Sequence, residues 1–277
     1  MSNIDIKNKV FLSTMRKLAI SAWGHPKDPS IYAQLELEVS PMIHFLNRYN
    51  KQSPIKVTSL HFVAKVLGCC LEKTPALNQV LIRNQLYQRS NINLFFPVHL
   101  KSKKSVNLSG VCVQDIPEKS LADIANDLHD QSLLLRRGAH KKLSRIHSFY
   151  RICPVFLVSA FTKIIDFFIY TLNINPSFLG VPKDLFGSML ISSLASFGLK
   201  EGYIPLYPFS RCPISVGVGS VYSRNEISDE GQLEKKAYMN LNFTADHRYL
   251  DGYQLARAER LLKKIFKNPS DYFSLIG

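Results

Sequence analysis

The stretch Asn242-Phe-Thr-Ala-Asp-His-Arg-Tyr-Leu-Asp-Gly252 places one imidazole, His247, four residues before a carboxylate, Asp251. The residues before it, Tyr238-Met-Asn-Leu-Asn-Phe-Thr244, contain no breaker and partly alternate polar with apolar side chains, which predicts a strand. A histidine between a strand and a helix is both held in place and exposed, as a general base requires. The residues after the stretch predict that helix, with apolar side chains at helical spacing: Leu255, Leu262, Ile265 and Phe266.

This arrangement resembles the HxxxDG signature of the chloramphenicol acetyltransferase and dihydrolipoyl acyltransferase superfamily. The flanking residues narrow the resemblance. Asp246-His247-Arg248 followed by Asp251-Gly252 is similar to the Asp-His-Arg-x-x-Asp-Gly form found in the acyltransferase subunits of 2-oxo acid dehydrogenase complexes.

A second block supports the same family. Phe186-Gly-Ser-Met-Leu-Ile-Ser-Ser-Leu-Ala-Ser-Phe-Gly198 is similar to the family's Gly-x-Phe-Thr-Ile-Ser-Asn-x-Gly segment, and Cys212-Pro-Ile-Ser-Val-Gly-Val-Gly219 resembles its next strand. By this alignment Ser192 takes the place of the serine that stabilises the oxyanion, with Ser193 as the alternative, and His247 takes the place of the base. Three earlier segments also resemble family motifs: Thr14–Ser21, Leu71–Asn78 and Lys119–Ala125.

The resemblance implies an α/β (α+β) fold of the chloramphenicol acetyltransferase type, with a mixed central sheet flanked by helices. We expect one acyltransferase catalytic domain over residues 1–277, because no stretch has the composition of a linker. No segment resembles a lipoyl domain or a peripheral-subunit-binding domain. The chain is therefore expected to carry no bound lipoyl group and to act on a freestanding acceptor or on another protein's lipoyl arm.

The family also implies roles for the site residues. His247 is the expected base and Ser192 the expected oxyanion donor, whereas Asp251 is mainly structural and is oriented by an arginine. Arg16 and Arg248 are both candidates for that arginine. In the family, the active site lies between subunits of a homotrimer, so His247 of one subunit is expected to face Ser192 of the next, with coenzyme A as the acyl carrier.

The net charge of +14 is a large basic excess. It favours anionic partners, such as acyl-coenzyme A, an acidic acyl or lipoyl carrier protein or an anionic membrane surface, although a basic surface can also serve only solubility. No motif indicates nucleic-acid binding. The five cysteines and the seven histidines other than His247 show no metal-ligand spacing, so no metal is expected. Those histidines are expected at surface or satisfied core positions, the cysteines are expected to be small buried apolar residues, and with no signal peptide the chain is expected in the cytoplasm.

The remaining pattern mixes helices with strands that are far apart in the sequence, as an α/β fold requires. Ser40 is the expected N-cap of the helix that follows the first clear strand. The elements are expected at residues 14–22 (helix), 31–39 (strand), 40–50 and 58–73 (helices), 94–100 and 106–113 (strands), and from the N-cap Ser120 to about 137 (helix closed by Gly138).

Residues 145–185 depart from the family pattern, which needs only a short connection here. The insert is dense in apolar residues, but Lys163 and Asp166 interrupt it, and this argues against a transmembrane span. We expect a buried or subunit-facing helix pair. The alternative is a helix lying in a membrane interface, which would make the protein membrane-associated.

The resulting hypothesis is a coenzyme A-dependent acyltransferase that moves an acyl group between a thioester and a thiol or hydroxyl acceptor by histidine general-base catalysis. One alternative is a non-catalytic trimeric scaffold, or a carrier- or membrane-binding protein, that keeps the fold. Another is a detoxifying acetyltransferase of small molecules, which the Asp-His-Arg form argues against. The sequence leaves the acceptor and the acyl chain length open.

Overall fold

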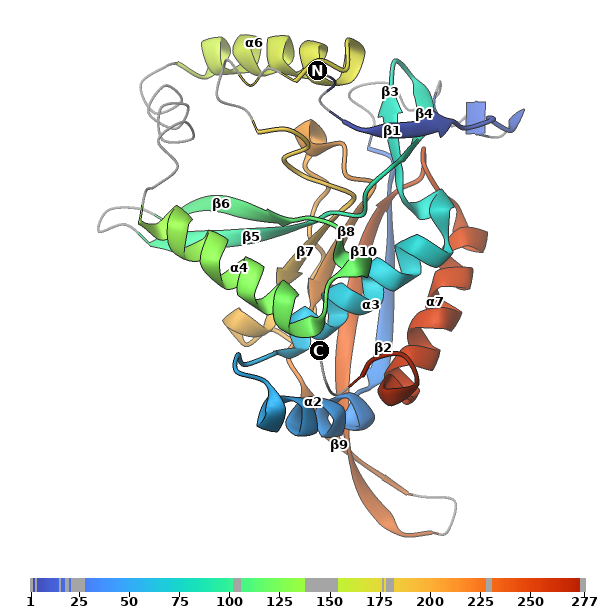
Figure 1. The fold of residues 1–277 in the computed structure, drawn as a ribbon. Coiled ribbons are helices and arrows are strands. Elements are labelled where there is room, and N and C mark those ends of the chain that lie inside the picture. Colours follow the sequence, from blue (N-terminus) through green and yellow to red (C-terminus); the bar gives the residue numbers. More distant parts are fainter. Residues whose placement is uncertain are drawn as a thin grey trace.

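A mixed sheet of seven strands forms the centre of the structure, in the order β2-β10-β8-β7-β5-β6, with β9 paired to the first part of β10 (Figure 1). The computed structural model describes residues 2, 4–14, 16–17, 20, 28–101, 106–137, 154–175, 177, 182–227 and 231–274. Strand β7 runs parallel to β5 and β8, and the other pairs are antiparallel. The strands are β2 (Ser30–Glu38), β5 (Leu94–Lys101), β6 (Val106–Val113), β7 (Met189–Ser193), β8 (Ile214–Val218), β9 (Tyr222–Ile227) and β10 (Leu233–Asp246).

A smaller antiparallel sheet has the strand order β1-β4-β3. The helices α2, α3, α4 and α7 cover one face of the large sheet (Figure 1). This arrangement of a mixed sheet flanked by helices confirms the expected fold class. The bounds are β1 (Ile6–Lys9), β3 (Gln79–Ile82), β4 (Gln85–Arg89), α2 (Ser40–Gln52), α3 (Ser59–Lys73), α4 (Leu121–Arg136), α6 (Val155–Asp166) and α7 (Gly252–Lys267).

Two of the expected helix starts can be compared with the structure. Ser120 is the N-cap of α4 as expected, and its hydroxyl accepts a hydrogen bond from the backbone N–H of Asp123 at 3.1 Å. The expected cap at Ser40 is wrong, because Val39 occupies the N-cap position of α2. The Ser40 hydroxyl instead accepts a hydrogen bond from the N–H of Ala237 in β10 at 3.1 Å, so it joins the helix to the sheet.

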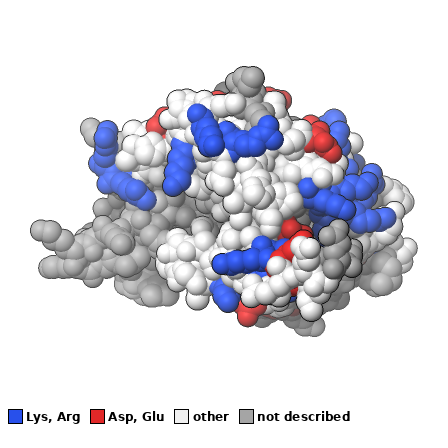
Figure 2. Space-filling view, turned by 90° about the horizontal axis from the view of Figure 1, so that it is seen from below, with Lys and Arg blue, Asp and Glu red and all other residues white. Residues whose placement is uncertain are grey.

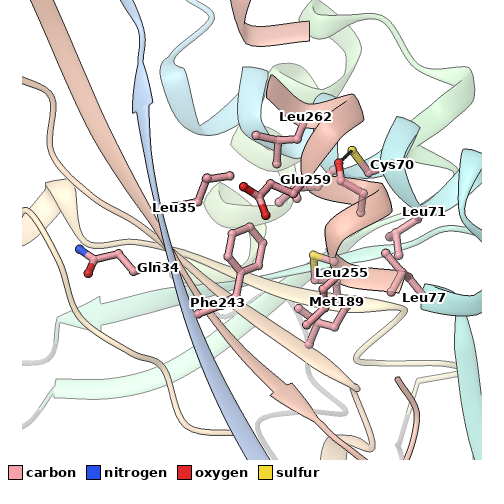
Figure 3. A pocket seen from close by; sticks show the side chains of 14 residues that line it. Gln34, Leu35, Cys70, Leu71, Leu77, Met189, Phe243, Leu255, Glu259 and Leu262 are labelled. Carbon is pink, nitrogen blue, oxygen red and sulfur yellow. Dashed lines mark hydrogen bonds between the residues drawn. The ribbon is translucent and has the colours of Figure 1, made fainter. Parts of the chain in front are cut away.

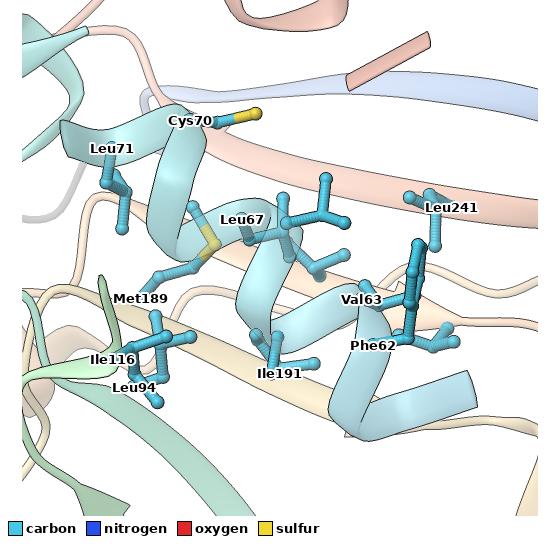
Figure 4. Packing of buried hydrophobic residues seen from close by; sticks show 14 of the residues in the cluster. Phe62, Val63, Leu67, Cys70, Leu71, Leu94, Ile116, Met189, Ile191 and Leu241 are labelled. Atoms are coloured by element: carbon cyan, nitrogen blue, oxygen red, sulfur yellow. The ribbon is translucent and has the colours of Figure 1, made fainter. Parts of the chain in front are cut away.

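Aromatic and aliphatic side chains fill the space between the helices and the sheet (Figure 4). Phe62 of α3 packs edge-on against Phe266 of α7, with ring centroids 5.3 Å apart. Ile191 of β7 and Leu241 of β10 come from the sheet and are also buried. Replacing a buried phenylalanine by alanine costs about 3–5 kcal/mol of folding stability. The contacts of this layer therefore hold α3 and α7 on the sheet.

The opposite face of the sheet is covered in part by the segment 199–207. The ring of Tyr203 packs edge-on against Tyr32 of β2, with centroids 5.2 Å apart, and the Gln34 amide donates to Glu201 at 2.8 Å. A Cβ added to Gly217 of β8 would lie 2.7 Å from the carbonyl oxygen of Gly202. Glycine at this position therefore allows the segment to lie directly against β8.

The expected insert contains α6. A π-helical turn, Phe167–Thr171, continues this helix. Its inner face is buried, but several apolar side chains on its outer face are exposed. The expected buried or subunit-facing helix pair stays a prediction, because this outer face is not buried within the chain itself. The first part of the expected insert, up to residue 153, lies outside the described residues. None of the described helices has the length and hydropathy that a membrane span needs.

Candidate active site

The turn that carries His247 is fixed on both sides by backbone hydrogen bonds. Strand β10 ends at Asp246, whose N–H donates to the carbonyl of Pro213 at 2.8 Å. The N–H of His247 donates to the carbonyl of Pro29 at 3.0 Å, just before β2 begins. The turn therefore lies between the start of β2 and the start of β8, and the half-buried His247 side chain has a defined position.

One hydrogen bond decides which nitrogen of His247 carries the lone pair. The Nδ1 atom lies 2.8 Å from the carbonyl oxygen of Leu250. A carbonyl oxygen can only accept a hydrogen bond, so Nδ1 must carry the proton in the neutral ring. The lone pair is then on Nε2, which gives that atom the capacity to take a proton from a substrate.

Asp251 begins helix α7. Its carboxylate accepts a hydrogen bond from the N–H of Tyr253 at 3.1 Å, and the side chain of Gln254 accepts one from the N–H of Asp251 at 2.7 Å. This is a capping box, which satisfies backbone donors at the start of the helix. Asp251 is therefore the N-cap of α7, and it holds the end of the turn that begins at His247.

The structure distinguishes the two candidate arginines. Arg16 lies 3.6 Å from the Asp251 carboxylate and donates to the carbonyl oxygen of His247 at 2.7 Å. Burial lowers the pKa of Arg16, against the attraction of Asp251 and Asp246. Arg248 instead binds the carboxylate of Asp246 through Nε and Nη2, the latter at 2.7 Å. Arg16 is thus the arginine that joins His247 to Asp251.

Ser192 lies near the end of β7, on the sheet face opposite the helices. Its neighbours Met189 and Ile191 belong to the helix-covered core, and side chains alternate between faces along a strand. The strand register places Ser192 beside Gly217 of β8, and Gly217 beside Asn242 of β10. The half-buried Ser192 is therefore on the face that the segment 199–207 covers in part.

Three further polar residues occupy that face and were not singled out from the sequence. Asn240, Asn242 and Thr244 are buried, yet the oxygens of their side chains make no hydrogen bond to any residue that the structure describes. Leaving such an atom unsatisfied costs about 1–3 kcal/mol. The signal in the sequence was the polar side chain at every second position of the strand before His247.

The structure does not bring Ser192 and His247 of one chain together. Ser192 is level with Asn242 two strands away, and His247 follows five residues further along the chain. At about 3.3 Å per residue and about 4.8 Å per strand, the two positions are on the order of 15–20 Å apart. They cannot act on the same carbonyl group within a single chain.

A separate cavity of about 80 Å³ lies on the helix-covered side of the sheet (Figure 3). Apolar side chains from α3, α7 and the sheet line it, among them Leu71, Leu255 and Phe243. Glu259 is the charged residue of its lining, and it forms an ion pair with Lys263 at 2.7 Å. The cavity and Ser192 are on opposite faces of the sheet, so the cavity does not join the expected catalytic residues.

Cysteine and metal chemistry receive no support from the described part of the chain. Cys70 and Cys212 are buried, and burial raises the pKa of each thiol to about 12. Both are therefore protonated at neutral pH, as expected of cysteines that serve as apolar residues. Among the described residues, no three His, Cys, Asp or Glu side chains are arranged to hold a metal ion.

The fold and the strand-turn-helix around His247 define an acyltransferase type of catalytic domain, and sequence comparison gives the family. The family model of the 2-oxoacid dehydrogenases acyltransferase (catalytic domain) matches residues 6–145 and 182–274. This chain belongs to that family, which confirms the expected membership and the expected class of enzyme. The match passes over residues 146–181, where the insert lies.

Individual relatives agree with this assignment. The chain is 21% identical over 253 residues to the lipoamide acyltransferase component of the branched-chain alpha-keto acid dehydrogenase complex of Bacillus subtilis (strain 168). The match covers 88% of this chain and 49% of that protein, so the chain spans about half the length of this relative.

Solved structures share the fold. The cubic core of the pyruvate dehydrogenase multienzyme complex superposes with a TM-score of 0.64 at 14% identity, covering 96% of this chain and 93% of that one. A dihydrolipoamide acetyltransferase of Azotobacter vinelandii superposes with a TM-score of 0.63 at 15% identity, with the same coverage of both chains. At these identities the likeness establishes the fold alone.

Proposed function

We propose that this chain transfers an acyl group between a coenzyme A thioester and a thiol or hydroxyl acceptor, with His247 as the general base. The hydrogen bond from Nδ1 of His247 to the carbonyl oxygen of Leu250 carries this proposal, because it leaves the lone pair on Nε2. The ion pair and hydrogen bond of Arg16 hold the same turn in place.

The reaction would proceed through a tetrahedral intermediate. Nε2 of His247 takes the proton from the acceptor while its sulfur or oxygen attacks the thioester carbonyl carbon. The carbonyl oxygen becomes negatively charged, and the Ser192 hydroxyl donates a hydrogen bond to it. The carbon–sulfur bond to coenzyme A then breaks, and the departing thiolate receives the proton from the imidazolium. No covalent acyl-enzyme is required.

The separation of His247 and Ser192 supports a site shared between subunits. Within one chain the two residues are too far apart to act on one carbonyl, and a neighbouring copy can supply the missing partner. One of the structures that share the fold is the cubic core of a multienzyme complex. We therefore propose a homotrimer in which His247 of one subunit and Ser192 of the next line a common channel.

A dihydrolipoyl thiol is the acceptor that the relatives favour. The Bacillus subtilis relative is a lipoamide acyltransferase, and the Azotobacter vinelandii enzyme is a dihydrolipoamide acetyltransferase, in which a serine, a histidine and an asparagine were investigated for their part in catalysis. This chain has a serine, a histidine and an aspartate in that order, namely Ser192, His247 and Asp251, so the third residue is an aspartate and not an asparagine.

The test is to incubate the purified protein with acyl-coenzyme A thioesters from short to long chains and to follow release of free thiol, with and without dihydrolipoamide. His247→Ala serves as the comparison. Release that needs His247 supports the proposal, and its chain-length preference identifies the acyl group. No release from folded trimer with any thioester would contradict it and favour a non-catalytic role.

A further inference from the structure

Helix α6 lies at the edge of the molecule, beside β1 and away from the α3 and α7 layer (Figure 1). It belongs to the region that the family match passes over. Its inner face packs into a second apolar cluster, where Ile165 and Ile169 meet Val80 and Ile82 of β3. The helix is therefore anchored to the small sheet, and its outer face has a fixed direction.

The outer face is an unpartnered apolar stripe. Its large side chains recur at helical spacing and occupy about 100° of the helix circumference. Contiguous apolar surface of this kind marks a contact with another molecule or with lipid. The exposed fractions are 70% for Phe156, 45% for Leu157, 52% for Ile164 and 50% for Phe167.

The charges on this helix and in the sequence before it favour an anionic partner. Lys163 is exposed at the edge of the stripe, whereas Asp166, the acidic residue of α6, is turned toward Arg211 and pairs with it at 3.0 Å. The sequence from residue 131 to residue 165 contains no acidic residue. It contains seven basic ones, namely Arg136, Arg137, Lys141, Lys142, Arg145, Arg151 and Lys163.

Charge alone does not mark one docking face. The face turned away from α6 also carries Lys and Arg side chains, in several groups separated by uncharged surface (Figure 2). The apolar stripe with the exposed Lys163 at its edge distinguishes α6. An anionic bilayer attracts a basic segment by about 1 kcal/mol per Lys or Arg near its surface, and apolar side chains of an interfacial helix enter the boundary between headgroups and acyl chains.

A second copy of the chain is the less favoured occupant, because the family shares its catalytic fold without residues 146–181. At about 1.5 Å per residue, α6 extends roughly 18 Å, which suits a helix lying in the plane of a membrane. We propose that the outer face of α6 docks the protein on an anionic lipid surface, with Phe156, Ile164 and Phe167 inserted and Lys163 among the headgroups.

The test is flotation of the purified protein with vesicles of phosphatidylcholine, with and without phosphatidylglycerol. The test variant combines Phe156→Glu, Ile164→Glu and Phe167→Glu. The matched control combines Ile227→Glu and Leu233→Glu, since these apolar residues of β9 and β10 are 76% and 73% exposed but far from α6. The wild type and the control are expected to float with the anionic vesicles, and the α6 variant to lose at least about tenfold in partitioning.

Three results would overturn the proposal. One is absence of wild-type flotation, and another is equal flotation of the α6 variant. The third is a changed assembly mass of the α6 variant together with flotation that the variant keeps, which would assign the stripe to a second copy. Sedimentation measures the mass, and circular dichroism verifies folding of the variants. His247→Ala is expected to float like the wild type, so this proposal and the proposed catalysis fail independently.

Discussion

Two histidines, His247 in the turn before α7 and His61 in the first turn of α3, differ in the partner of Nδ1. In His247, Nδ1 faces the carbonyl oxygen of Leu250 and must donate. In His61, Nδ1 accepts a hydrogen bond from the N–H of Thr58 at 3.2 Å, as part of a capping box at the start of α3. His61 thus satisfies a helix end, as expected for a histidine without metal spacing.

The comparison shows that one hydrogen bond determines which ring nitrogen of a neutral imidazole carries the lone pair. The lone pair of His61 is used within the protein, and burial lowers the pKa of this ring to about 4. The lone pair of His247 is on Nε2, on a half-buried side chain in a turn that Arg16 holds. Only the second arrangement suits a general base.

The largest expected effect is on the rate of acyl transfer, and it distinguishes His247 from His61. His247→Ala should lower kcat/KM for acyl transfer by about 10³–10⁴-fold, because it removes the base. His61→Gln should leave the rate within about twofold, because a glutamine at this position of a capping box can also accept from the Thr58 N–H. Thiol release measured for both purified variants decides this. Similar losses in the two would contradict the distinction.

The next effect concerns the oxyanion donor that His247 would work with. Ser192→Ala should lower kcat by about 10²–10³-fold, since one donor to the tetrahedral intermediate is lost. Ser193→Ala is the matched control, because this neighbour belongs to the other face of the sheet. Steady-state kinetics should show the loss mainly in kcat. A larger loss in Ser193→Ala would move the role to Ser193.

A smaller effect is expected from the group that orients His247. Arg16→Gln should lower kcat by roughly 10–100-fold, because it releases the carbonyl of His247 and the carboxylate of Asp251 while leaving the imidazole present. Arg224→Gln is the control, since it breaks an exposed pair with Glu36, which the strand register places beside Asn240 and not at the turn that carries His247. An unchanged rate in Arg16→Gln would show that the turn holds itself.

The smallest effect is on stability and concerns His61. Its folded pKa of about 4 lies below the ordinary value of 6.5, so the unfolded chain binds more protons between these pH values. The free energy of unfolding should therefore decrease as the pH falls from 6.5 to 4, by about 1–3 kcal/mol.

Urea unfolding at pH 7 and pH 4.5 measures this decrease. His61→Gln should show a weaker pH dependence than the wild type, whereas His129→Gln, at an exposed position on α4, should not. Equal pH dependence in the wild type and His61→Gln would mean that other groups dominate acid destabilisation.

Local patterns in the sequence predicted much of the fold. The strand and helix around His247, the apolar helix α3 and the cap at Ser120 all follow from alternation, helical spacing and capping chemistry within a few residues. The cap at Ser40 failed because its hydroxyl bonds to a strand almost 200 residues away, and a local rule contains no such partner.

The candidate site was predictable in its residue types but not in its contacts. The sequence proposed Arg16 and Arg248 equally for Asp251, and only the fold brings Arg16 to His247 across more than two hundred residues. The unsatisfied oxygens of Asn240, Asn242 and Thr244 also depend on which strands and loops cover them. Tertiary packing decides both, so neither could be predicted from spacing.

The central claim is a catalytic site that combines His247 of one subunit with Ser192 of another. Co-expression of His247→Ala and Ser192→Ala chains carrying different tags, followed by purification of hybrid assemblies, tests it most directly. Each purified hybrid trimer contains both kinds of chain, and one of its three sites then combines an intact His247 with an intact Ser192, so activity should recover to about one third of the wild-type value. Activity that stays at the level of the separate variants would contradict the claim.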